Sequence, residues 1–155
     1  MNDRFQSLIA EVTTAIAGRP LDGALEGWLN RQFPADGPWF SSTVQACRDG
    51  IAEGWMCARG EPSLRWGRVA KPSEALAGFS IDVVDMNDIA GPHHAHPQGE
   101  IDLVMPLTPG ATFDGQGAGW KVYGPGTAHR PTVRQGRALV LYLLPQGSIE
   151  FSQAA

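Results

Sequence analysis

The sequence predicts a mainly β fold, a small antiparallel β-barrel preceded by an N-terminal helical segment. Before about residue 60, apolar residues recur at helical spacing, whereas short apolar or alternating runs divided by Gly and Pro follow it. Strands and helices do not alternate, which argues against a parallel sheet. We therefore expect a helical segment over 1–58, packed on the barrel or in a dimer interface, and a barrel domain over 59–155.

Three narrow apolar stripes predict three helices in the first segment. Gly18 and Pro20 end the first stripe, and Pro38 suits the first turn of the third helix. Because narrow stripes do not stabilise a helix alone, each helix needs a partner surface. The stripes are Phe5, Leu8, Ile9, Val12 and Ile16; Leu21, Leu25, Trp28 and Leu29; and Phe40, Val44, Cys47, Ile51 and Trp55.

Short runs after residue 60 predict the strands of the barrel. Gly- and Pro-rich separators divide them at the spacing of a β-sandwich or small barrel. Exposed edge strands, together with the narrow helical stripes, favour a homodimer. The runs are 63–71, 78–86, 100–107, 111–115, 119–124, 137–144 and 148–151.

Composition excludes several classes of partner. Charged residues make up 18% of the chain, the net charge is −4, and no basic cluster exists, so we expect no nucleic-acid partner. The sequence has no apolar stretch of about 18 residues and no signal-peptide core, so we expect no membrane partner. Cys47 and Cys57 match no C-x-x-C pattern, which favours packed thiols and a cytoplasmic location. Without a G-x-G-x-x-G motif or P-loop, we expect no nucleotide cofactor.

All four histidines lie in "GPHHAHPQGE" and "YGPGTAHRP". On a strand, His94 and His96 share one face and His93 points to the other. The turn after His96 would return Glu100 beside them in a hairpin, and His129 would add a ligand from a distant strand. This set suits one divalent metal such as Fe, Mn, Zn or Ni, with positions left open for catalysis. The alternative is an ordinary hydrogen-bonded polar network.

These motifs resemble the paired metal-binding motifs of the cupin superfamily. His94, His96 and Glu100 match the H-x-H…E motif, and Gly126 and His129 match the later G-x-x-H. This resemblance implies a cupin-type jelly-roll barrel. More narrowly, "LRWGRVAKP", "GPHHAHPQGEIDLVMPL" and "YGPGTAHRPTV" look like the small bacterial family that includes 4-hydroxylaminobenzoate lyase, which acts in nitrobenzoate degradation.

The narrower resemblance implies a metal-dependent lyase that converts 4-hydroxylaminobenzoate to protocatechuate and ammonia. The metal at His94, His96, Glu100 and His129 would act as a Lewis acid, with Asp102 or His93 moving protons. Alternatives are another metal-dependent cupin enzyme, either an aromatic-ring dioxygenase or a sugar or small-acid isomerase, and a non-enzymatic cupin that binds a small ligand.

A small aromatic carboxylate substrate needs aromatic walls and a cation. Trp66, Tyr123 and Tyr142 are candidates for the walls, although most barrel aromatics belong to the core. Arg65 or Arg68 could hold the carboxylate as a guanidinium fork. Because these two arginines face opposite ways on a strand, at most one should point inward, and both could simply be solvated.

Overall fold

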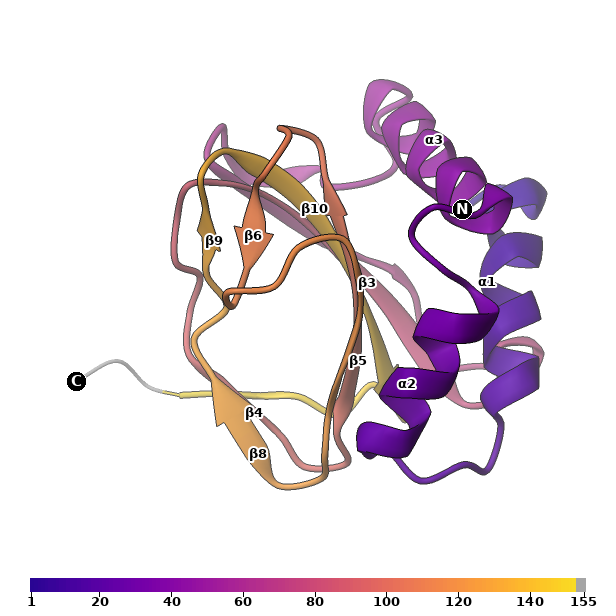
Figure 1. Ribbon diagram of the computed structural model, residues 1–155. Helices are drawn as coiled ribbons and strands as arrows, with labels where there is room; N and C mark the ends of the chain where they lie inside the picture. Colours follow the sequence, from indigo (N-terminus) through magenta and orange to yellow (C-terminus); the bar gives the residue numbers. More distant parts are fainter. Residues whose placement is uncertain (153–155) are drawn as a thin grey trace.

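The computed structural model describes residues 1–152 and places three helices before a set of antiparallel strands (Figure 1). The helices are α1 (Asp3–Ile16), α2 (Gly23–Gln32) and α3 (Pro38–Ala52). They lie on one side of the largest sheet, as Figure 1 shows. The predicted fold class is confirmed: the chain is mainly β, with antiparallel sheets after a helical segment. In residues 1–152, no helix is both long and apolar enough to cross a membrane.

Local capping explains where the helices begin. The side chain of Asn2 accepts a hydrogen bond from the backbone nitrogen of Phe5 at 2.9 Å, and Asp22 caps α2 in the same way. The third stripe outlasts its helix, because α3 ends at Ala52. Trp55 instead folds back, and its ring lies 5.7 Å from that of Phe5.

Three antiparallel sheets follow the helices. The strands pair β1-β2-β3-β10-β5-β7 in a six-stranded sheet, β11-β4-β8 in a second sheet and β6-β9 in a third. Segments 59–61 and 133–134 form strands that the sequence pattern did not indicate, because each is three residues or shorter, and the strand expected at His129 covers 127–129. The strands are β1 (Arg59–Glu61), β2 (Leu64–Ala70), β3 (Phe79–Asn87), β4 (His94–His96), β5 (Glu100–Pro106), β6 (Thr112–Phe113), β7 (Gly119–Tyr123), β8 (Thr127–His129), β9 (Val133–Arg134), β10 (Arg137–Pro145) and β11 (Glu150–Phe151), with a 3-10 turn η1 (Glu74–Leu76) before β3.

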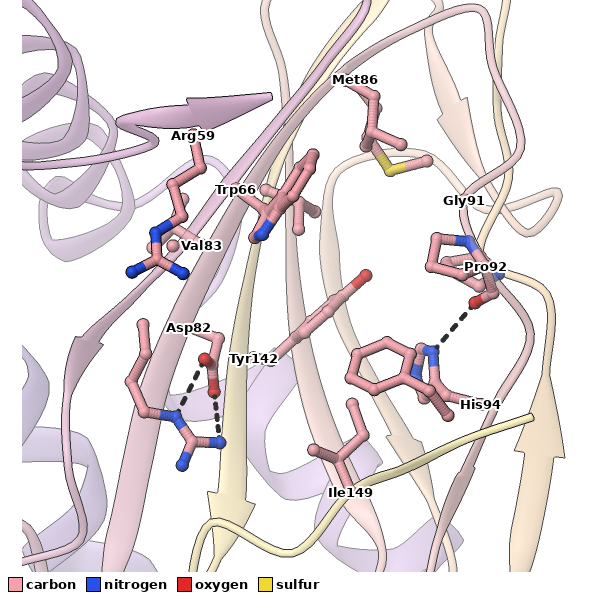
Figure 2. A pocket seen from close by; sticks show the side chains of 16 residues that line it. Arg59, Trp66, Asp82, Val83, Met86, Gly91, Pro92, His94, Tyr142 and Ile149 are labelled. Carbon is pink, nitrogen blue, oxygen red and sulfur yellow. Dashed lines mark hydrogen bonds and ion pairs between the residues drawn. The ribbon is translucent and has the colours of Figure 1, made fainter. Parts of the chain in front are cut away.

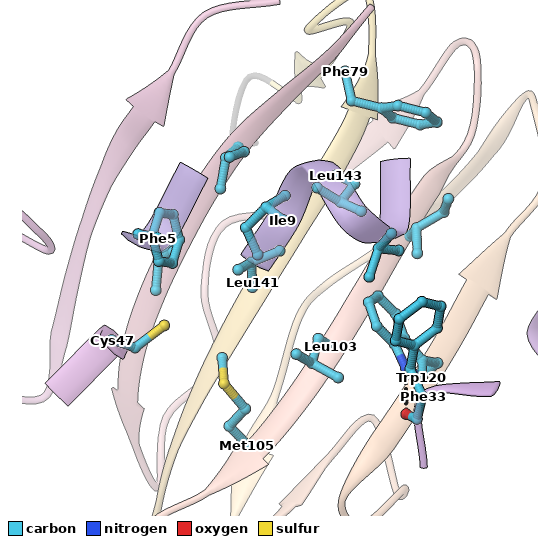
Figure 3. Packing of buried hydrophobic residues seen from close by; sticks show 14 of the residues in the cluster. Phe5, Ile9, Phe33, Cys47, Phe79, Leu103, Met105, Trp120, Leu141 and Leu143 are labelled. Carbon is cyan, nitrogen blue, oxygen red and sulfur yellow. Dashed lines mark hydrogen bonds between the residues drawn. The ribbon is translucent and has the colours of Figure 1, made fainter. Parts of the chain in front are cut away.

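The six-stranded sheet is buried on both faces. On β10, Leu141 and Leu143 pack toward the helices with Ile9, as Figure 3 shows, whereas Val140 and Tyr142 belong to a separate core inside the barrel. This alternation explains the unbroken apolar run of β10. The helices therefore cover the outer face of the sheet and leave the inner face to the barrel.

Trp120 joins the helical segment to the sheet through hydrogen bonds. Its indole Nε1 donates to the carbonyl oxygen of Phe33 at 3.0 Å, and its backbone nitrogen donates to Asn30 Oδ1 at 2.9 Å. A buried tryptophan with its N–H paired suits a position between two layers. Trp120 therefore fixes α2 and the segment after it to β7 on the outer face of the sheet.

Candidate metal centre

Three imidazole Nε2 atoms converge on one carboxylate inside the barrel. His94 Nε2 lies 3.1 Å from Glu100 Oε1, whereas the Nε2 atoms of His96 and His129 lie 3.2 and 3.3 Å from Oε2. One ligand atom from each of the four residues lies within 4.8 Å of the others. The structure thus brings together the four residues that the sequence predicts as metal ligands.

Two different sheets supply these side chains. β4 carries His94 and His96 on one face and pairs with β8, where His94 stands opposite His129. The prediction of a hairpin between His96 and Glu100 is wrong, because β4 and β5 belong to different sheets. The chain instead turns a corner at Gly99, whose nitrogen donates to the carbonyl oxygen of His96 at 3.1 Å.

Gly99 is required at this corner. Its φ of +90° lies in the region that side chains disfavour, and a Cβ there would meet the carbonyl oxygen of Tyr123 at 2.8 Å. The tight corner places Glu100, the first residue of β5, beside His96, the last residue of β4. A short turn at Gly99 between two sheets therefore brings Glu100 beside the histidines, as we expected a hairpin to do.

The outward nitrogen of each histidine has its own partner. The Nδ1 atom contacts the carbonyl oxygen of Pro92 at 3.3 Å in His94, and Thr127 Oγ1 at 3.0 Å in His96. In His129, Nδ1 lies 2.6 Å from a carboxylate oxygen of Asp114. Acceptors at Nδ1 hold the proton there, so the lone pairs of the Nε2 atoms face inward.

The sequence pattern did not indicate Asp114 or Thr127 as residues of the site. Asp114 lies 15 residues from His129 and also accepts hydrogen bonds from the Tyr123 hydroxyl and the Thr132 backbone nitrogen. Thr127 donates to the carbonyl oxygen of Gly124, which leaves its oxygen free to accept from His96. The available signals were a polar residue near the end of a predicted strand for Asp114 and one in a Gly- and Pro-rich separator for Thr127.

The arrangement fits a cation at the centre. His96 Nε2 and Glu100 Oε2 are buried and lie 3.2 Å apart, and within residues 1–152 neither forms a well-aligned hydrogen bond. Converging lone pairs repel one another unless a positive charge lies between them. Three imidazoles and one carboxylate form a donor set that suits Fe, Mn, Zn or Ni. The residues present therefore fit a divalent metal.

The electrostatics of the cluster also favour positive charge. Burial alone would raise the pKa of Glu100, but its close contacts with His129, His94 and His96 hold that pKa well below its usual range. For His129, burial opposes protonation, yet hydrogen bonds to Asp114 and Glu100 raise its pKa to about 9. Both shifts favour positive charge at the centre of the cluster.

Asp102 and His93, two further residues predicted for the site, lie in different places. Asp102 follows Glu100 on the same face of β5 and is fully buried, and its two oxygens lack hydrogen-bond partners among the described residues. Burial and the neighbouring Glu100 raise the pKa of Asp102 well above its usual range. His93 points to the opposite face, where Nδ1 contacts Ser152 Oγ at 2.5 Å.

A cavity of about 490 Å³ opens beside His94. Trp66, Tyr142 and Phe151 form part of its wall, and Figure 2 shows the Tyr142 hydroxyl directed into it. Trp66 and Phe151 are 45% and 60% exposed, so they stand at the opening. This volume lies in the range of about 300–1,000 Å³ that is common for small-ligand sites.

The remaining predicted residues divide between the cavity and other surfaces. Arg68 lines the cavity, whereas Arg65 forms an ion pair with Asp85 at 2.6 Å on the other face of the sheet. Of the two arginines, only Arg68 points inward, as expected for residues on opposite faces of a strand. Tyr123 lies outside the cavity lining, and its ring packs 4.4 Å from that of His129.

The chain is similar to proteins of known activity. The family model for PnbB, 4-hydroxylaminobenzoate lyase, matches residues 7–151. A 4-hydroxylaminobenzoate lyase from Pseudomonas putida is 30% identical, over 96% of this chain and 94% of that protein. Another from Nocardioides sp. (strain LMS-CY) is 36% identical, over 82% of this chain and 80% of that protein.

Solved structures are similar in fold at low sequence identity. A chain from crystal structures of DMSP lyases is 13% identical, covers 97% of this chain and 96% of its own length, and has a TM-score of 0.54. An RmlC-like cupin protein from Ralstonia eutropha has a TM-score of 0.45 at 11% identity, over 62% of this chain and 64% of that chain. The first of these likenesses extends over both the helical segment and the strands.

Proposed function

The chain belongs to the 4-hydroxylaminobenzoate lyase family, and from this we propose that it converts 4-hydroxylaminobenzoate to protocatechuate and ammonia, using one divalent metal ion. The observation that carries the metal role is the convergence of His94, His96, Glu100 and His129 beside a cavity with aromatic walls. A ligand set open to a cavity is typical of a catalytic metal rather than a structural one.

The reaction balances with one molecule of water and needs no oxidant. The N–O bond of the hydroxylamino group breaks, a hydroxyl group appears on the adjacent ring carbon, and oxygen replaces nitrogen on the carbon that carried it. Ammonia leaves with that nitrogen. A bound divalent metal would supply Lewis acidity and lower the pKa of a water molecule to roughly 7.

The chain's own residues bind and orient the substrate. Trp66 and Tyr142 flank the cavity and offer faces against which a benzene ring can pack. The Tyr142 hydroxyl, directed into the same space, can donate a hydrogen bond to an oxygen or nitrogen of the substrate (Figure 2). These side chains hold the ring beside His94, the histidine that lines the cavity.

We do not assign to Asp102 or His93 the direct proton transfer that the sequence suggested for them. Asp102 lies outside the cavity lining and next to Glu100, so we assign it a positioning role that acts through the Glu100 carboxylate. His93 contacts Ser152 on the opposite face of β4, which separates it from the reacting atoms. Glu100 is then the carboxylate available for orienting groups at the centre.

The test combines product detection with metal analysis. We expect protein supplied with a divalent metal to release protocatechuate and ammonia in equal amounts without taking up oxygen, and we expect chelation to abolish this until metal is restored. Oxygen uptake matching turnover would instead indicate a ring dioxygenase. Full activity in a metal-free preparation would refute the metal role.

Two neighbouring histidines provide a matched pair of variants. His96→Ala should lose metal and activity together, because it removes an Nε2 atom at the centre. His93→Ala makes the same chemical change three residues earlier, on the opposite face, and should keep both within about twofold of the wild type, as is usual for surface changes. Equal losses in the two variants would contradict the assigned ligand set.

A further inference from the structure

Two arginines line the cavity, and they differ in what already holds them. Arg68 donates from Nε to Asp82 Oδ1 at 3.0 Å and from Nη2 to Asp82 Oδ2 at 3.2 Å. Its Nη2 also donates to the carbonyl oxygen of Gly147 at 3.2 Å. The positive charge of Arg68 is therefore matched by a carboxylate, and most of its donors are in use.

Arg59, the second cation, has no such partner. Among residues 1–152 its guanidinium forms neither an ion pair nor a side-chain hydrogen bond. Its five N–H donors remain available in the fork geometry that matches a carboxylate. An exposed guanidinium with these properties at the wall of a cavity is suited to an anionic ligand.

Strand register places Arg59 on the same wall of the cavity as Trp66. β1 pairs antiparallel with β2, and Arg59 stands directly opposite Trp66. Opposed residues project from the same face of a sheet, so the guanidinium and the indole share one wall. Figure 2 shows Arg59 and His94 on opposite sides of the cavity, with Trp66 and Tyr142 between them.

The formal charge of the lining favours one carboxylate. Arg59 and Arg68 contribute two positive charges and Asp82 contributes one negative charge, which leaves one positive charge unmatched. A carboxylate near Arg68 would also meet Asp82, which already pairs with Arg68, whereas Arg59 has no carboxylate partner among residues 1–152. The unmatched charge thus lies at the side of the cavity away from His94.

We propose that Arg59 binds the carboxylate of the aromatic substrate and so sets the preference for a carboxylate para to the reacting nitrogen. The inference rests on the proposed function, because it places the nitrogen at the His94 side of the cavity. It assigns to Arg59 the task that the sequence suggested for Arg65 or Arg68. Arg65 is unsuited because it pairs with Asp85 outside the cavity.

The turnover test compares two substrates that differ by the carboxylate, 4-hydroxylaminobenzoate and N-phenylhydroxylamine. In Arg59→Gln, kcat/KM for 4-hydroxylaminobenzoate should fall about 10- to 100-fold, the effect of losing a charge-assisted hydrogen bond, mainly through KM. The value for N-phenylhydroxylamine should stay unchanged, and Arg59→Lys should recover part of the loss. Arg65→Gln, on the adjacent strand and the opposite face, is the control and should keep the full preference.

A binding test separates this inference from the proposed reaction. 4-Aminobenzoate and its neutral isostere 4-aminobenzamide are titrated calorimetrically into metal-loaded wild type and Arg59→Gln. The wild type should prefer the carboxylate, and the variant should lose that preference. Failure of the wild type to turn over 4-hydroxylaminobenzoate would overturn the proposed reaction, and the binding result would then decide the role of Arg59 alone. Retention of the carboxylate preference in Arg59→Gln, or its loss in Arg65→Gln, would overturn the inference.

Discussion

Replacing Asp114 with asparagine isolates the role of a hydrogen bond that holds a candidate ligand. The Asp114 carboxylate accepts from His129 Nδ1 at 2.6 Å and from the Thr132 backbone nitrogen at 2.9 Å. In Asp114→Asn, one end of the side chain becomes a donor. If the amide nitrogen faces His129, it forces the ring proton onto Nε2, and if it faces Thr132, it opposes another N–H group.

Either orientation weakens metal binding. Removing the partner of a ligand histidine typically costs about 10- to 100-fold in metal affinity, which is about 1.4–2.7 kcal/mol. The upper end applies here because the Asp114 side chain is only 15% exposed, so water replaces the lost acceptor poorly. The deficit should also depend on pH. Asp114 helps raise the pKa of His129 to about 9, so at lower pH the wild type must lose a proton to bind metal.

The assay is a chelator-competition titration of metal at about pH 7 and about pH 9. We expect the deficit of Asp114→Asn to be largest at the higher pH, where protons no longer compete in the wild type. Asp88→Asn is the control, since it removes the same charge from a side chain that is 63% exposed. Affinity within twofold of the wild type at pH 9, or an equal loss in Asp88→Asn, would refute the positioning role.

Three other variants test separate parts of the structure. Tyr142→Phe should keep its metal content while kcat/KM falls about fivefold, the value of one neutral hydrogen bond, and an unchanged rate would remove its hydroxyl from substrate binding. Asp85→Asn leaves two half-exposed arginines unpaired and should lower the free energy of unfolding by about 2–3 kcal/mol at pH 7. Burial would raise the pKa of Asp85, but hydrogen bonds from both arginines lower it. In urea unfolding, the stability difference between wild type and Asp85→Asn should therefore shrink as the pH falls below 3.8, and a difference that does not change with pH would exclude the charged pair. Gly99→Ala strains the corner before Glu100 and should lower the free energy of unfolding by about 1–3 kcal/mol and weaken metal binding. A variant that unfolds and binds metal like the wild type would show that the corner tolerates a side chain.

The sequence predicts those parts of the fold that local periodicity encodes. Helical stripes indicate the three helices, and alternation on a strand separates His94 and His96 from His93. The same alternation predicts that only one of Arg65 and Arg68 points inward. Each of these results depends on residues a few positions apart, where backbone geometry alone fixes the relative direction of the side chains.

What the sequence could not predict depends on which strands become neighbours. Asp114 follows β6 and meets His129 because β6 pairs with β9, the strand after β8, and no local pattern reports that pairing. Arg59 lies in a three-residue edge strand that carries no apolar signal, yet its register with Trp66 places it on the cavity wall. Residue type thus identified the candidate ligands, whereas their supports and the free cation required the fold.

The four candidate ligands come from two sheets that are joined at a corner, so a bound ion would fasten one sheet to the other. An unfolded chain cannot present these groups together, and an ion that binds the folded state alone stabilises it by mass action. At a free concentration 100 times its dissociation constant, such an ion adds about 2.7 kcal/mol to the free energy of unfolding. The amount of intact protein in a cell would then follow metal supply, because metal-starved chains open more often and become accessible to proteases.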